Sequence, residues 1–201
     1  MREIIIATRN PGKLKEIREL LKDLNIQVRS LADYPDSPVV EEDGKTFAAN
    51  ALKKAVTIAF YTNKLTLGED SGLEVRALHN QPGVYSSRFS GPGAEDKKNN
   101  AKLLRNLKGV PLKKRQARYR CFAALVDRHG IVDVADGSCG GLIAPRAKGR
   151  NGFGYDSLFF IPRYHKTFGE LEPSVKAKIS HRARALKKIK KSLQKYFESR
   201  R

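Results

Sequence analysis

The sequence predicts an α/β fold with a mixed β-sheet flanked by helices, and three observations lead to this prediction. Short apolar runs rich in β-branched residues recur along the chain, as is typical of strands. Segments with leucine or alanine at helical spacing lie between them. Two longer alternating stretches follow each other in the middle of the chain, which indicates an antiparallel pair. Strands that alternate with helices favour a partly parallel sheet, so we expect the whole sheet to be mixed.

The first third of the chain predicts two strands and two helices. Residues 2–8 (REIIIAT) are a β-branched run bounded by a turn, and residues 26–34 indicate a second strand. Residues 14–24 place aliphatic side chains at helical spacing, and residues 46–62 are rich in alanine and read as helical. Two prolines mark residues 35–46 as a loop.

The middle of the chain predicts more strands around a long loop. Residues 64–78 are expected to form a strand, a turn and a strand, with Gly72 at the bend. Residues 80–98 are rich in Gly, Pro and Ser and are expected to be a loop of the kind that often carries function. Residues 99–110 indicate a helix that ends near Gly109.

The last third predicts a hairpin, a turn and a terminal helix. Residues 117–143 read as two alternating strands around a turn at residues 128–130. Residues 149–162 are a glycine-rich turn that leads into an aromatic strand. From Ser180 onward the pattern predicts a basic amphipathic helix.

Length and cysteine content indicate one intracellular domain. The 201 residues suit a single domain, residues 1–201, in which two lobes are conceivable. Such a chain buries roughly 70% of its unfolded surface, so it needs no disulfide or metal to fold. Cys121 and Cys139 are expected to be small buried residues in strands. No segment has the length of a membrane span, and the N-terminal apolar run is short for a signal peptide, so we expect a cytoplasmic protein.

The charge of the chain favours anionic partners. Lys and Arg number 40 and Asp and Glu 21, a formal net charge of +19. A field of this sign attracts nucleic acid, nucleotides or acidic membrane surfaces, and does not choose among them.

A basic turn near the N-terminus is the first candidate binding site. Residues 8–13 (TRNPGK) lie between a predicted strand and a predicted helix. Free N–H groups at a helix N-terminus favour anions. Thr8 and Asn10 can hydrogen-bond phosphate oxygens, Gly12 allows close approach, and Lys13 adds a positive charge. The Walker spacing is absent, so an ordinary capping turn with a solvent-facing lysine is the alternative.

Acidic residues gather at two places in this basic chain. Glu41, Glu42 and Asp43 share one loop, and Glu69 and Asp70 are expected at the end of a strand. Carboxylates presented in this way are typical ligands of Mg²⁺. The alternative is plain turn chemistry, since both stretches contain good turn residues.

Five motifs together resemble the inosine triphosphate pyrophosphatase family. They are, in chain order, ATRNPGKLKE, EDSGLEV, PGVYSSRFSG, NGFGYDSLFF and KAKISHRARAL, and they cover nearly the whole chain. Any one of them is weak evidence, but five in register are specific.

The resemblance implies a fold and an activity. Members of this family have an elongated mixed sheet flanked by helices, with a nucleotide cleft between two lobes. They hydrolyse ITP, dITP and XTP to the monophosphate and pyrophosphate, depend on Mg²⁺ and are usually homodimers.

The resemblance also implies site residues. Asp70 corresponds to the general base and a metal ligand, and Glu42 to the second metal-binding carboxylate, although Glu41 stays open for that part. The residues implied to bind the substrate are Thr8, Arg9, Asn10, Pro11, Gly12, Lys13, Lys54, Ser71, Phe153, Gly154, Tyr155, Asp156, Lys176, His181 and Arg182.

Two departures and two rival interpretations accompany the resemblance. Glu69 stands where the family more often has Asp, and Ser157 where many members have Pro. The basic helix from Arg182 onward keeps a nucleic-acid-binding protein as an alternative, although a helix docked on the core with solvated lysines explains the same pattern. A pyrophosphatase of the related Maf type is the closer rival, and the SHR and FGYD motifs disfavour it.

Overall fold

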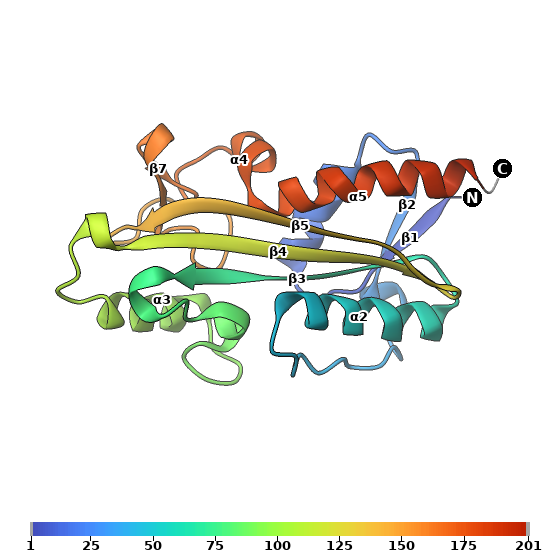
Figure 1. Ribbon diagram of the computed structural model, residues 1–201, viewed down its shortest axis with the longest axis horizontal. Coiled ribbons are helices and arrows are strands. Elements are labelled where there is room, and N and C mark those ends of the chain that lie inside the picture. Colours follow the sequence, from blue (N-terminus) through green and yellow to red (C-terminus); the bar gives the residue numbers. More distant parts are fainter. Residues whose placement is uncertain (1, 200–201) are drawn as a thin grey trace. The chain divides into compact units, whose positions relative to one another are not determined.

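The computed structural model describes residues 2–199 (Figure 1). Strands alternate with α-helices up to residue 106, and the four strands between residues 116 and 167 follow one another without an α-helix. The described strands form one seven-stranded sheet in the order β2-β1-β3-β4-β5-β6-β7. The strands are β1 (Glu3–Ile6), β2 (Gln27–Ser30), β3 (Thr66–Val75), β4 (Gln116–Asp127), β5 (Gly130–Ile143), β6 (Phe159–Ile161) and β7 (Lys166–Thr167). Strand β1 is parallel to β2 and β3, whereas β6 is antiparallel to β5 and β7. The predicted mixed sheet is therefore confirmed.

Five α-helices and five short 3₁₀ helices occur in the described part of the chain. The α-helices are α1 (Pro11–Leu21), α2 (Phe47–Thr62), α3 (Asp96–Asn106), α4 (Pro173–Ile179) and α5 (His181–Glu198). The 3₁₀ helices are η1 (Leu31–Asp33), η2 (Arg76–Leu78), η3 (Gly83–Arg88), η4 (Leu112–Lys114) and η5 (Pro162–Tyr164). None of the helices within residues 2–199 combines the length and apolar character that a membrane span needs.

The chain divides into two compact units. Unit 1 contains residues 2–70, 121–137 and 181–199, and unit 2 contains residues 71–120 and 138–180. Strands β3, β4 and β5 each contribute residues to both units. The lobes and the nucleotide cleft that the resemblance implied stay predictions, as does the single domain over residues 1–201.

Alternation along the strands gives unit 1 two apolar layers. Ile4 and Ile6 of β1 pack in one cluster with residues of α1 and α5, and Ile5 packs in another cluster with Ile58 of α2. Successive side chains of a strand point to opposite faces, so a continuous apolar strand can serve both layers. Helix α2 accordingly covers one face of the sheet, and α1 and α5 cover the other (Figure 1).

Unit 2 has its own aromatic core. Tyr119, Phe159 and Phe168 lie together, with ring centroids 4.7 Å apart for Tyr119–Phe159 and 5.0 Å apart for Phe159–Phe168. Leu103 of α3 and Leu107, just after that helix, are fully buried in the same cluster. The apolar face of α3 thereby anchors the helix in this core. Its polar side chains are available to form hydrogen bonds with the neighbouring loops.

Two expectations about the elements are wrong, and one helix was missed. The predicted turn at Gly72 does not exist, because β3 runs unbroken from Thr66 to Val75. The Asp-Ser-Gly sequence is turn-like only locally, and the buried residues on both sides hold it in the sheet. Helix α3 begins at Asp96 rather than residue 99, and α4 was missed because its seven residues are too short for a clear periodic signal.

The other elements agree with the sequence. The hairpin strands β4 and β5 are neighbours in the sheet, and Cys121 and Cys139 lie buried on them as free thiols. The terminal helix is present as α5, and the end of the predicted segment, residues 200–201, lies outside the described residues.

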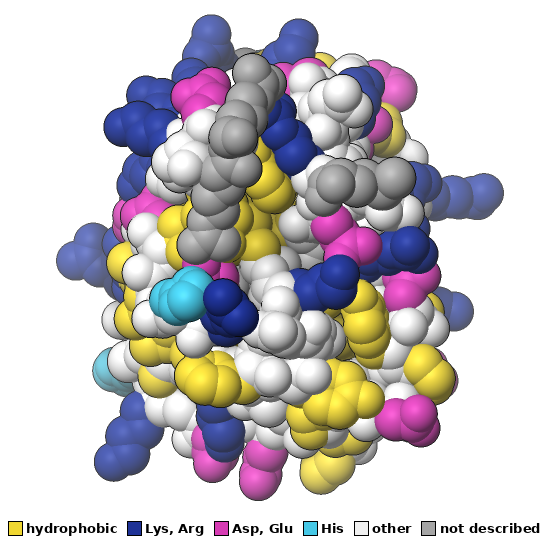
Figure 2. Space-filling model, turned by 90° about the vertical axis from the view of Figure 1, so that its right-hand side faces the viewer, with side chains coloured by type: hydrophobic (Ala, Val, Ile, Leu, Met, Phe, Trp, Pro, Cys, Tyr) yellow, Lys and Arg dark blue, Asp and Glu magenta, His cyan; other side chains and the backbone are white. Residues whose placement is uncertain are grey.

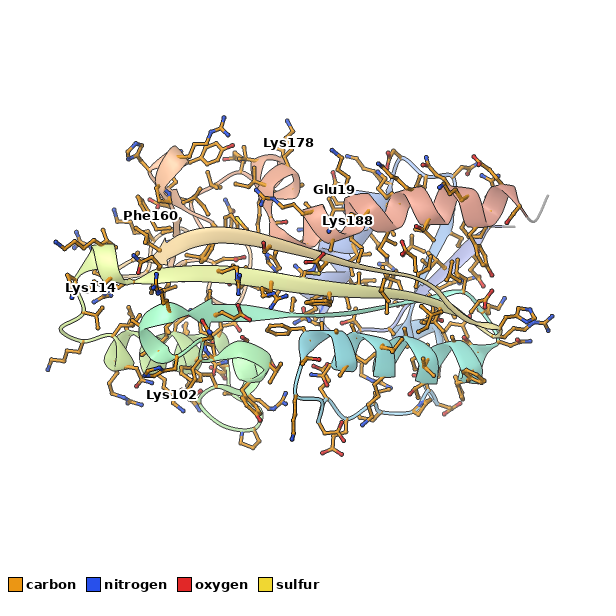
Figure 3. All side chains as sticks on the ribbon, in the orientation of Figure 1. Glu19, Lys102, Lys114, Phe160, Lys178 and Lys188 are labelled. Carbon is orange, nitrogen blue, oxygen red and sulfur yellow. The ribbon has the colours of Figure 1, made fainter. Side chains whose placement is uncertain are left out.

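Most of the positive charge lies on the surface. On the face drawn in Figure 2, lysine and arginine side chains project outward with acidic side chains among them. Lys114, Lys178 and Lys188, which Figure 3 labels, are all exposed. Among the described residues the buried exceptions are Lys54, Arg115, Lys176 and Arg182. Three of these four, all but Arg115, are residues that the sequence assigns to the site.

Two glycines let helices approach the sheet closely in unit 1. A Cβ at Gly68 of β3 would lie 2.2 Å from the backbone oxygen of Ala51 and 2.7 Å from the nitrogen of Ala55, both in α2. A Cβ at Gly137 of β5 would lie 2.2 Å from the backbone oxygen of His181 in α5. Both contacts are with backbone, which cannot move aside as a flexible side chain would. These glycines therefore set the height of α2 and α5 above the strands.

Replacing Gly68 by alanine should destabilise the protein by about 1–3 kcal/mol, because the added methyl group overpacks the contact with α2. Gly140→Ala is the matched control, since a Cβ at this strand position meets nothing within 4 Å. Urea unfolding of both variants measures the difference. Equal midpoints for the two variants would contradict the proposed close approach.

Candidate active site

The basic turn is held by its own side chains at the start of α1. The backbone N–H of Lys13 donates to Asn10 Oδ1 at 3.0 Å, so Asn10 caps the helix. The backbone N–H of Asn10 donates to Thr8 Oγ1 at 3.2 Å, and Arg9 donates to the carbonyl of Ser37 at 3.1 Å. Pro11 and Gly12 form the first residues of α1 rather than a loop. The capping alternative is thus correct for Asn10, whereas the lysine does not simply face solvent.

The two neighbouring acidic residues of β3 point to opposite faces of the sheet. Glu69 and Asp70 lie in the middle of this ten-residue strand, so the expectation of a strand end is wrong. Leu67, two residues before Glu69, packs in the cluster of α1 and α5, and Gly68, two residues before Asp70, contacts α2. By the alternation of side chains, Glu69 faces α1 and α5 and Asp70 faces α2.

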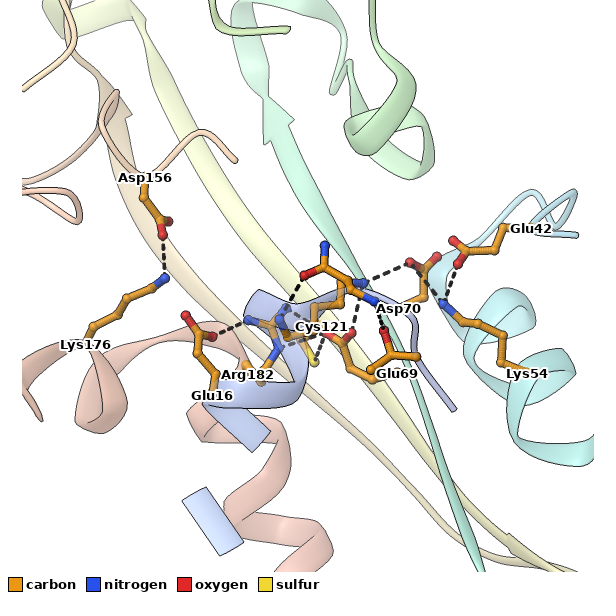
Figure 4. A network of polar contacts seen from close by, with 12 residues as sticks. Glu16, Glu42, Lys54, Glu69, Asp70, Cys121, Asp156, Lys176 and Arg182 are labelled. Atoms are coloured by element: carbon orange, nitrogen blue, oxygen red, sulfur yellow. Dashed lines mark hydrogen bonds and ion pairs between the residues drawn. The ribbon is translucent and has the colours of Figure 1, made fainter. Parts of the chain in front are cut away.

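Asp70 lies between two lysines on the α2 face (Figure 4). Its Oδ1 is 3.8 Å from the ammonium nitrogen of Lys13 and 3.8 Å from that of Lys54. Its Oδ2 accepts a hydrogen bond of 3.0 Å from the side-chain amide of Asn50. Asn50 is fully buried, and its own oxygen accepts the backbone N–H of Gly44 at 2.8 Å. Helix α2 thus orients Asp70 through Asn50 and Lys54, one turn apart on the same face.

Glu42 joins this group through Lys54. The Lys54 ammonium lies 2.7 Å from Glu42 Oε1, while Glu41 is exposed and forms no polar contact with any described residue. The loop that carries Glu42 is held to α2 at Asp43, which pairs with Lys53 at 2.7 Å. The placement favours Glu42 over Glu41 as the partner carboxylate of Asp70.

Glu69 forms a buried ionic network on the other face (Figure 4). Its Oε2 is 2.9 Å from the Lys13 ammonium, and its Oε1 accepts from Arg182 Nη2 at 3.0 Å. The Cys121 thiol donates to the same Oε1 at 3.2 Å, and Arg182 also pairs with Glu16 of α1. Both charged groups of the Glu69–Arg182 pair are almost completely buried, so each needs the other.

The network shifts the pKa values of its members in different directions. Burial raises the pKa of Asp70, against the lowering influence of Lys13 and Lys54. Burial would also raise the pKa of Glu69, but the charges of Arg182 and Lys13 hold it well below its usual range. Burial raises the pKa of the Cys121 thiol well above its ordinary value. Asp70 is therefore the more basic of the two carboxylates, and Cys121 stays a neutral hydrogen-bond donor.

Glu42 and Asp70 offer oxygen donors that fit a hard cation. The Lys54 ammonium lies within 4 Å of a carboxylate oxygen of each residue, so a positive charge is already placed between them. Mg²⁺ is usually held by one or two carboxylates together with substrate phosphates and waters. Within residues 2–199 no cluster of three or more His, Cys, Asp or Glu side chains is arranged as a metal cage. The donor set therefore suits a metal that arrives with a polyphosphate.

The other predicted binding residues form a second group, in unit 2. Asp156 Oδ2 accepts the backbone N–H of Phe153 at 3.0 Å and the Lys176 ammonium at 2.5 Å. The same ammonium lies 5.2 Å from the centroid of the half-buried Phe153 ring, within reach of a cation–π contact. Asp156 is thus the anchor of a turn that presents an aromatic ring.

The structure brings five of the predicted residues of unit 1 into one network. Lys13, Glu42, Lys54 and Asp70 are linked by ion pairs, and Arg182 joins them through Glu69. Thr8 and Asn10 make local contacts at the start of α1, Arg9 contacts Ser37, and His181 is buried at the start of α5. Ser71 follows Asp70 on β3 and belongs to unit 2.

Sequence reasoning missed three members of the network: Asn50, Glu16 and Cys121. Asn50 had a visible signal, because an amide among alanines of a buried helix needs polar partners. Glu16 looked like any exposed helix residue, and Cys121 like a small apolar strand residue. Neither pattern reveals a contact with a side chain far away in the sequence.

Comparison with known proteins identifies the class of this chain. Residues 4–192 match the Ham1 family, and the chain belongs to this family. This confirms the resemblance that the five motifs carried.

Particular relatives match nearly the whole length of the chain. A dITP/XTP pyrophosphatase of Desulforamulus reducens is 50% identical over 97% of both chains. The solved structure of a HAM1 protein from Coxiella burnetii has a TM-score of 0.87 and 38% identity and covers 97% of this chain and 100% of that one. The solved structure of a nucleoside-triphosphatase, or dITP/XTP pyrophosphatase, from Mycobacterium abscessus has a TM-score of 0.75 and 39% identity. It covers 93% of this chain and 98% of that one.

Replacing Glu69 by glutamine should cost about 3–5 kcal/mol of stability, because it removes the shared counter-charge of Lys13 and Arg182 and leaves Arg182 with Glu16 and Lys13 with Asp70 alone. Glu19→Gln is the matched control: Glu19 pairs with Lys22 at 2.6 Å, but both side chains are mostly exposed, so its unfolding midpoint should not change. Urea unfolding at neutral pH compares the two. A Glu69→Gln variant as stable as the control would show that the network does not hold the fold.

Proposed function

We propose that this protein hydrolyses the non-standard purine nucleoside triphosphates ITP, dITP and XTP to the monophosphate and pyrophosphate. The observation that carries the proposal is the buried Asp70 carboxylate between Lys13 and Lys54, with Glu42 beside Lys54. A carboxylate base flanked by cations suits the attack of water on a polyphosphate. The names of the Desulforamulus and Mycobacterium relatives support this substrate class. The hydrolysis would remove these nucleotides before their incorporation into DNA and RNA.

Mg²⁺ belongs to the proposal, with Glu42 and Asp70 as the residues that would hold it. When bound, the ion neutralises charge on the polyphosphate and favours the ionised form of a water. The carboxylates themselves would otherwise repel the substrate.

Asp70 would orient the attacking water and take its proton. Attack at the α-phosphorus forms the new P–O bond and breaks the bond to the oxygen that bridges the α- and β-phosphorus. A raised pKa makes the Asp70 carboxylate a better proton acceptor, while Asn50 fixes one of its oxygens.

Lys13 and Lys54 would hold the departing pyrophosphate. Their ammonium groups are positioned by carboxylates before any substrate arrives, which avoids reorganisation during the reaction. Thr8, Arg9, Asn10, Pro11 and Gly12 are proposed to line the triphosphate next to Lys13, and Ser71 to contact the substrate beside Asp70.

The base is proposed to stack on Phe153 in the turn that contains Gly154, Tyr155 and Asp156. Every purine offers a π-face, so stacking contributes affinity for all purines. Discrimination between one purine and another must therefore come from hydrogen bonds. Lys176, His181 and Arg182 are proposed as donors to the oxygen at position 6, which adenine replaces by an amine. A site of buried donors can reject such a mismatch by about 10⁴–10⁵-fold.

Pyrophosphate release from ITP, XTP, dITP, ATP and GTP, with Mg²⁺ and with EDTA, tests the proposal. We expect release from ITP, XTP and dITP that needs the metal, and at most slow release from ATP and GTP. Equal release from all five would agree with the proposed hydrolysis but would contradict the proposed selectivity of the base pocket. No release from any nucleotide would contradict the proposal that the protein is a pyrophosphatase.

The Asp70→Asn substitution should lower kcat for ITP by at least about 10²-fold, since it removes the positioned base. Asp43→Asn in the neighbouring loop is the control, because Asp43 pairs only with the exposed Lys53. Steady-state kinetics and nucleotide-binding titrations separate turnover from binding. Turnover of Asp70→Asn at the control rate would refute the part assigned to Asp70.

A homodimer and a cytoplasmic location complete the proposal. The family resemblance supports the dimer, and two free, buried thiols agree with a reducing compartment. The sedimentation behaviour of the purified chain tests the first of these.

Nucleic acid contact is a second candidate, and one observation favours it. Residues 97–126 contain no aspartate or glutamate. Exposed cations of this stretch that form no ion pair with any described residue are Lys97, Lys98, Arg105, Lys108, Lys113 and Lys114. On α5, where sequence reasoning placed this candidate, Lys188 pairs with Asp136 at 2.7 Å and Lys190 with Asp23. Exposed cations without an ion pair to any described residue therefore occur around α3 and η4 as well as on α5, where Lys187, Lys191 and Lys195 are of this kind.

A salt titration of binding to a single-stranded DNA oligonucleotide tests this location. Replacing Lys97, Lys98, Lys113 and Lys114 by glutamine should reduce the slope of log K against log salt by about 2–3. The control replaces four exposed lysines of α5, namely Lys187, Lys188, Lys191 and Lys195, and so has the same net charge. An equal loss in both variants would show that binding follows net charge alone.

A further inference from the structure

Two side chains of helix α3 form hydrogen bonds with the backbone of Gly154, in the turn that carries Phe153. The backbone N–H of Gly154 donates to Asp96 Oδ2 at 2.6 Å, and the side-chain amide of Asn100 donates to the Gly154 carbonyl at 3.0 Å. Both hydrogen-bonding groups of one residue are thus held by two side chains of one helix.

The spacing of the two side chains explains both hydrogen bonds. Asp96 and Asn100 are four residues apart in the first turns of α3, so they lie on the same face of the helix. Leu103, also on α3, anchors the helix in the apolar core of unit 2. Asp96 is exposed and Asn100 half-buried, but the helix that carries both is anchored in the core.

The backbone conformation of Gly154 explains why hydrogen bonds are needed to restrain it. Its φ of +63° lies in the left-handed region, where glycine is free to move among several conformations. Asp156 restrains the turn from inside through the N–H of Phe153. Asp96 and Asn100 restrain it from outside, at the residue that follows Phe153.

The same helix also fixes a second segment of unit 2. Asn99, which is buried, accepts from the backbone N–H of Ser90 at 2.8 Å and donates to the carbonyl of Ser87 at 3.1 Å. The Tyr155 hydroxyl in turn donates to the carbonyl of Ser86 at 2.8 Å. The turn and residues 86–90 are thus joined to α3 and to each other.

We propose that Asp96 and Asn100 are positioning residues that set the purine-binding turn through Gly154 without touching the nucleotide. The proposal rests on the proposed function, since it assigns the turn to the base. None of the five family motifs contains either residue, and sequence reasoning placed Asp96 in a loop and Asn100 in a helix without assigning a site role to either one. The contacts to Gly154 are what single them out.

The consequence concerns affinity and selectivity more than the chemical step. If the turn loosens, Phe153 and the donors beside it are no longer held for one base shape, whereas Asp70 and its lysines belong to a separate network. Loss of a hydrogen bond to a charged acceptor corresponds to a change of about 10–100-fold in an equilibrium constant. The change should therefore appear in KM and in the choice between ITP and ATP.

Three variants of α3 test the proposal by steady-state kinetics with ITP and ATP. Asp96→Ala should raise KM for ITP by about 10-fold or more, with kcat within about threefold of wild type, and should narrow the preference for ITP over ATP. Asp96→Asn keeps an oxygen acceptor for the Gly154 N–H and should restore most of the affinity. Glu95→Ala is the matched control, since Glu95 is an exposed acidic residue one position earlier whose side chain caps nothing.

Hydrogen exchange at the Gly154 amide gives a readout that does not depend on turnover. It should become about tenfold faster or more in Asp96→Ala and stay unchanged in Glu95→Ala. Asp96→Ala with the kinetics of the control, or a fall in kcat alone, would overturn the proposal even in an active enzyme. A wild-type chain that hydrolyses neither nucleotide would instead overturn the proposed function, and with it the purpose assigned to the turn.

Discussion

The fold of unit 1 depends on two charged residues placed side by side in the middle of a buried strand. Glu69 and Asp70 are both removed from water on β3, and burial of an unpaired carboxylate is strongly unfavourable. Each must therefore meet cations within the protein. Because they point to opposite faces, the cations must come from both layers of helices: Lys54 from α2, Arg182 from α5, and Lys13 from the start of α1.

This requirement links the packing to the chemistry. The helices can deliver their cations only if they lie close to the sheet, and Gly68 and Gly137 provide the space where α2 and α5 meet the strands. The same close packing excludes water around Asp70 and so raises its pKa. Two carboxylates of nearly identical sequence context thereby acquire different properties. Glu69 is locked in a structural network, and Asp70 is the more basic group beside the lysines.

In unit 2, hydrogen bonds with backbone groups position the turn that carries predicted site residues. In its turn at Phe153, the backbone N–H of Phe153 donates to Asp156, the N–H of the left-handed Gly154 donates to Asp96 of α3, and Asn100 of α3 donates to the Gly154 carbonyl. The inner face of α3 holds loops, while its outer side contributes to the unpaired positive charge of residues 97–114. One short helix thus shapes both a candidate base pocket and a candidate polyanion surface.

The sequence by itself determined the class of fold and the family, and it predicted the residues of the site. Apolar periodicity predicted most of the strands and helices, the five motifs in register indicated Lys13, Asp70 and the turn at Phe153, and the family resemblance added Lys54. These features depend on local residue order, which a sequence displays directly. The family assignment in particular needed no knowledge of contacts.

Only the tertiary structure decided which groups touch. It placed Glu69 and Asp70 inside a continuous strand where local chemistry suggested a turn, because burial on both faces outweighs turn propensity. It also brought Glu16, Asn50 and Cys121 into the ionic network, and Asp96 and Asn100 onto Gly154. These contacts join residues distant in the chain, and the side chains involved look like ordinary surface or core residues until the helices dock. The neighbours of a residue along the chain determine its conformational preference. Its partners in the tertiary structure determine its pKa and the groups that it contacts, and these decide its function.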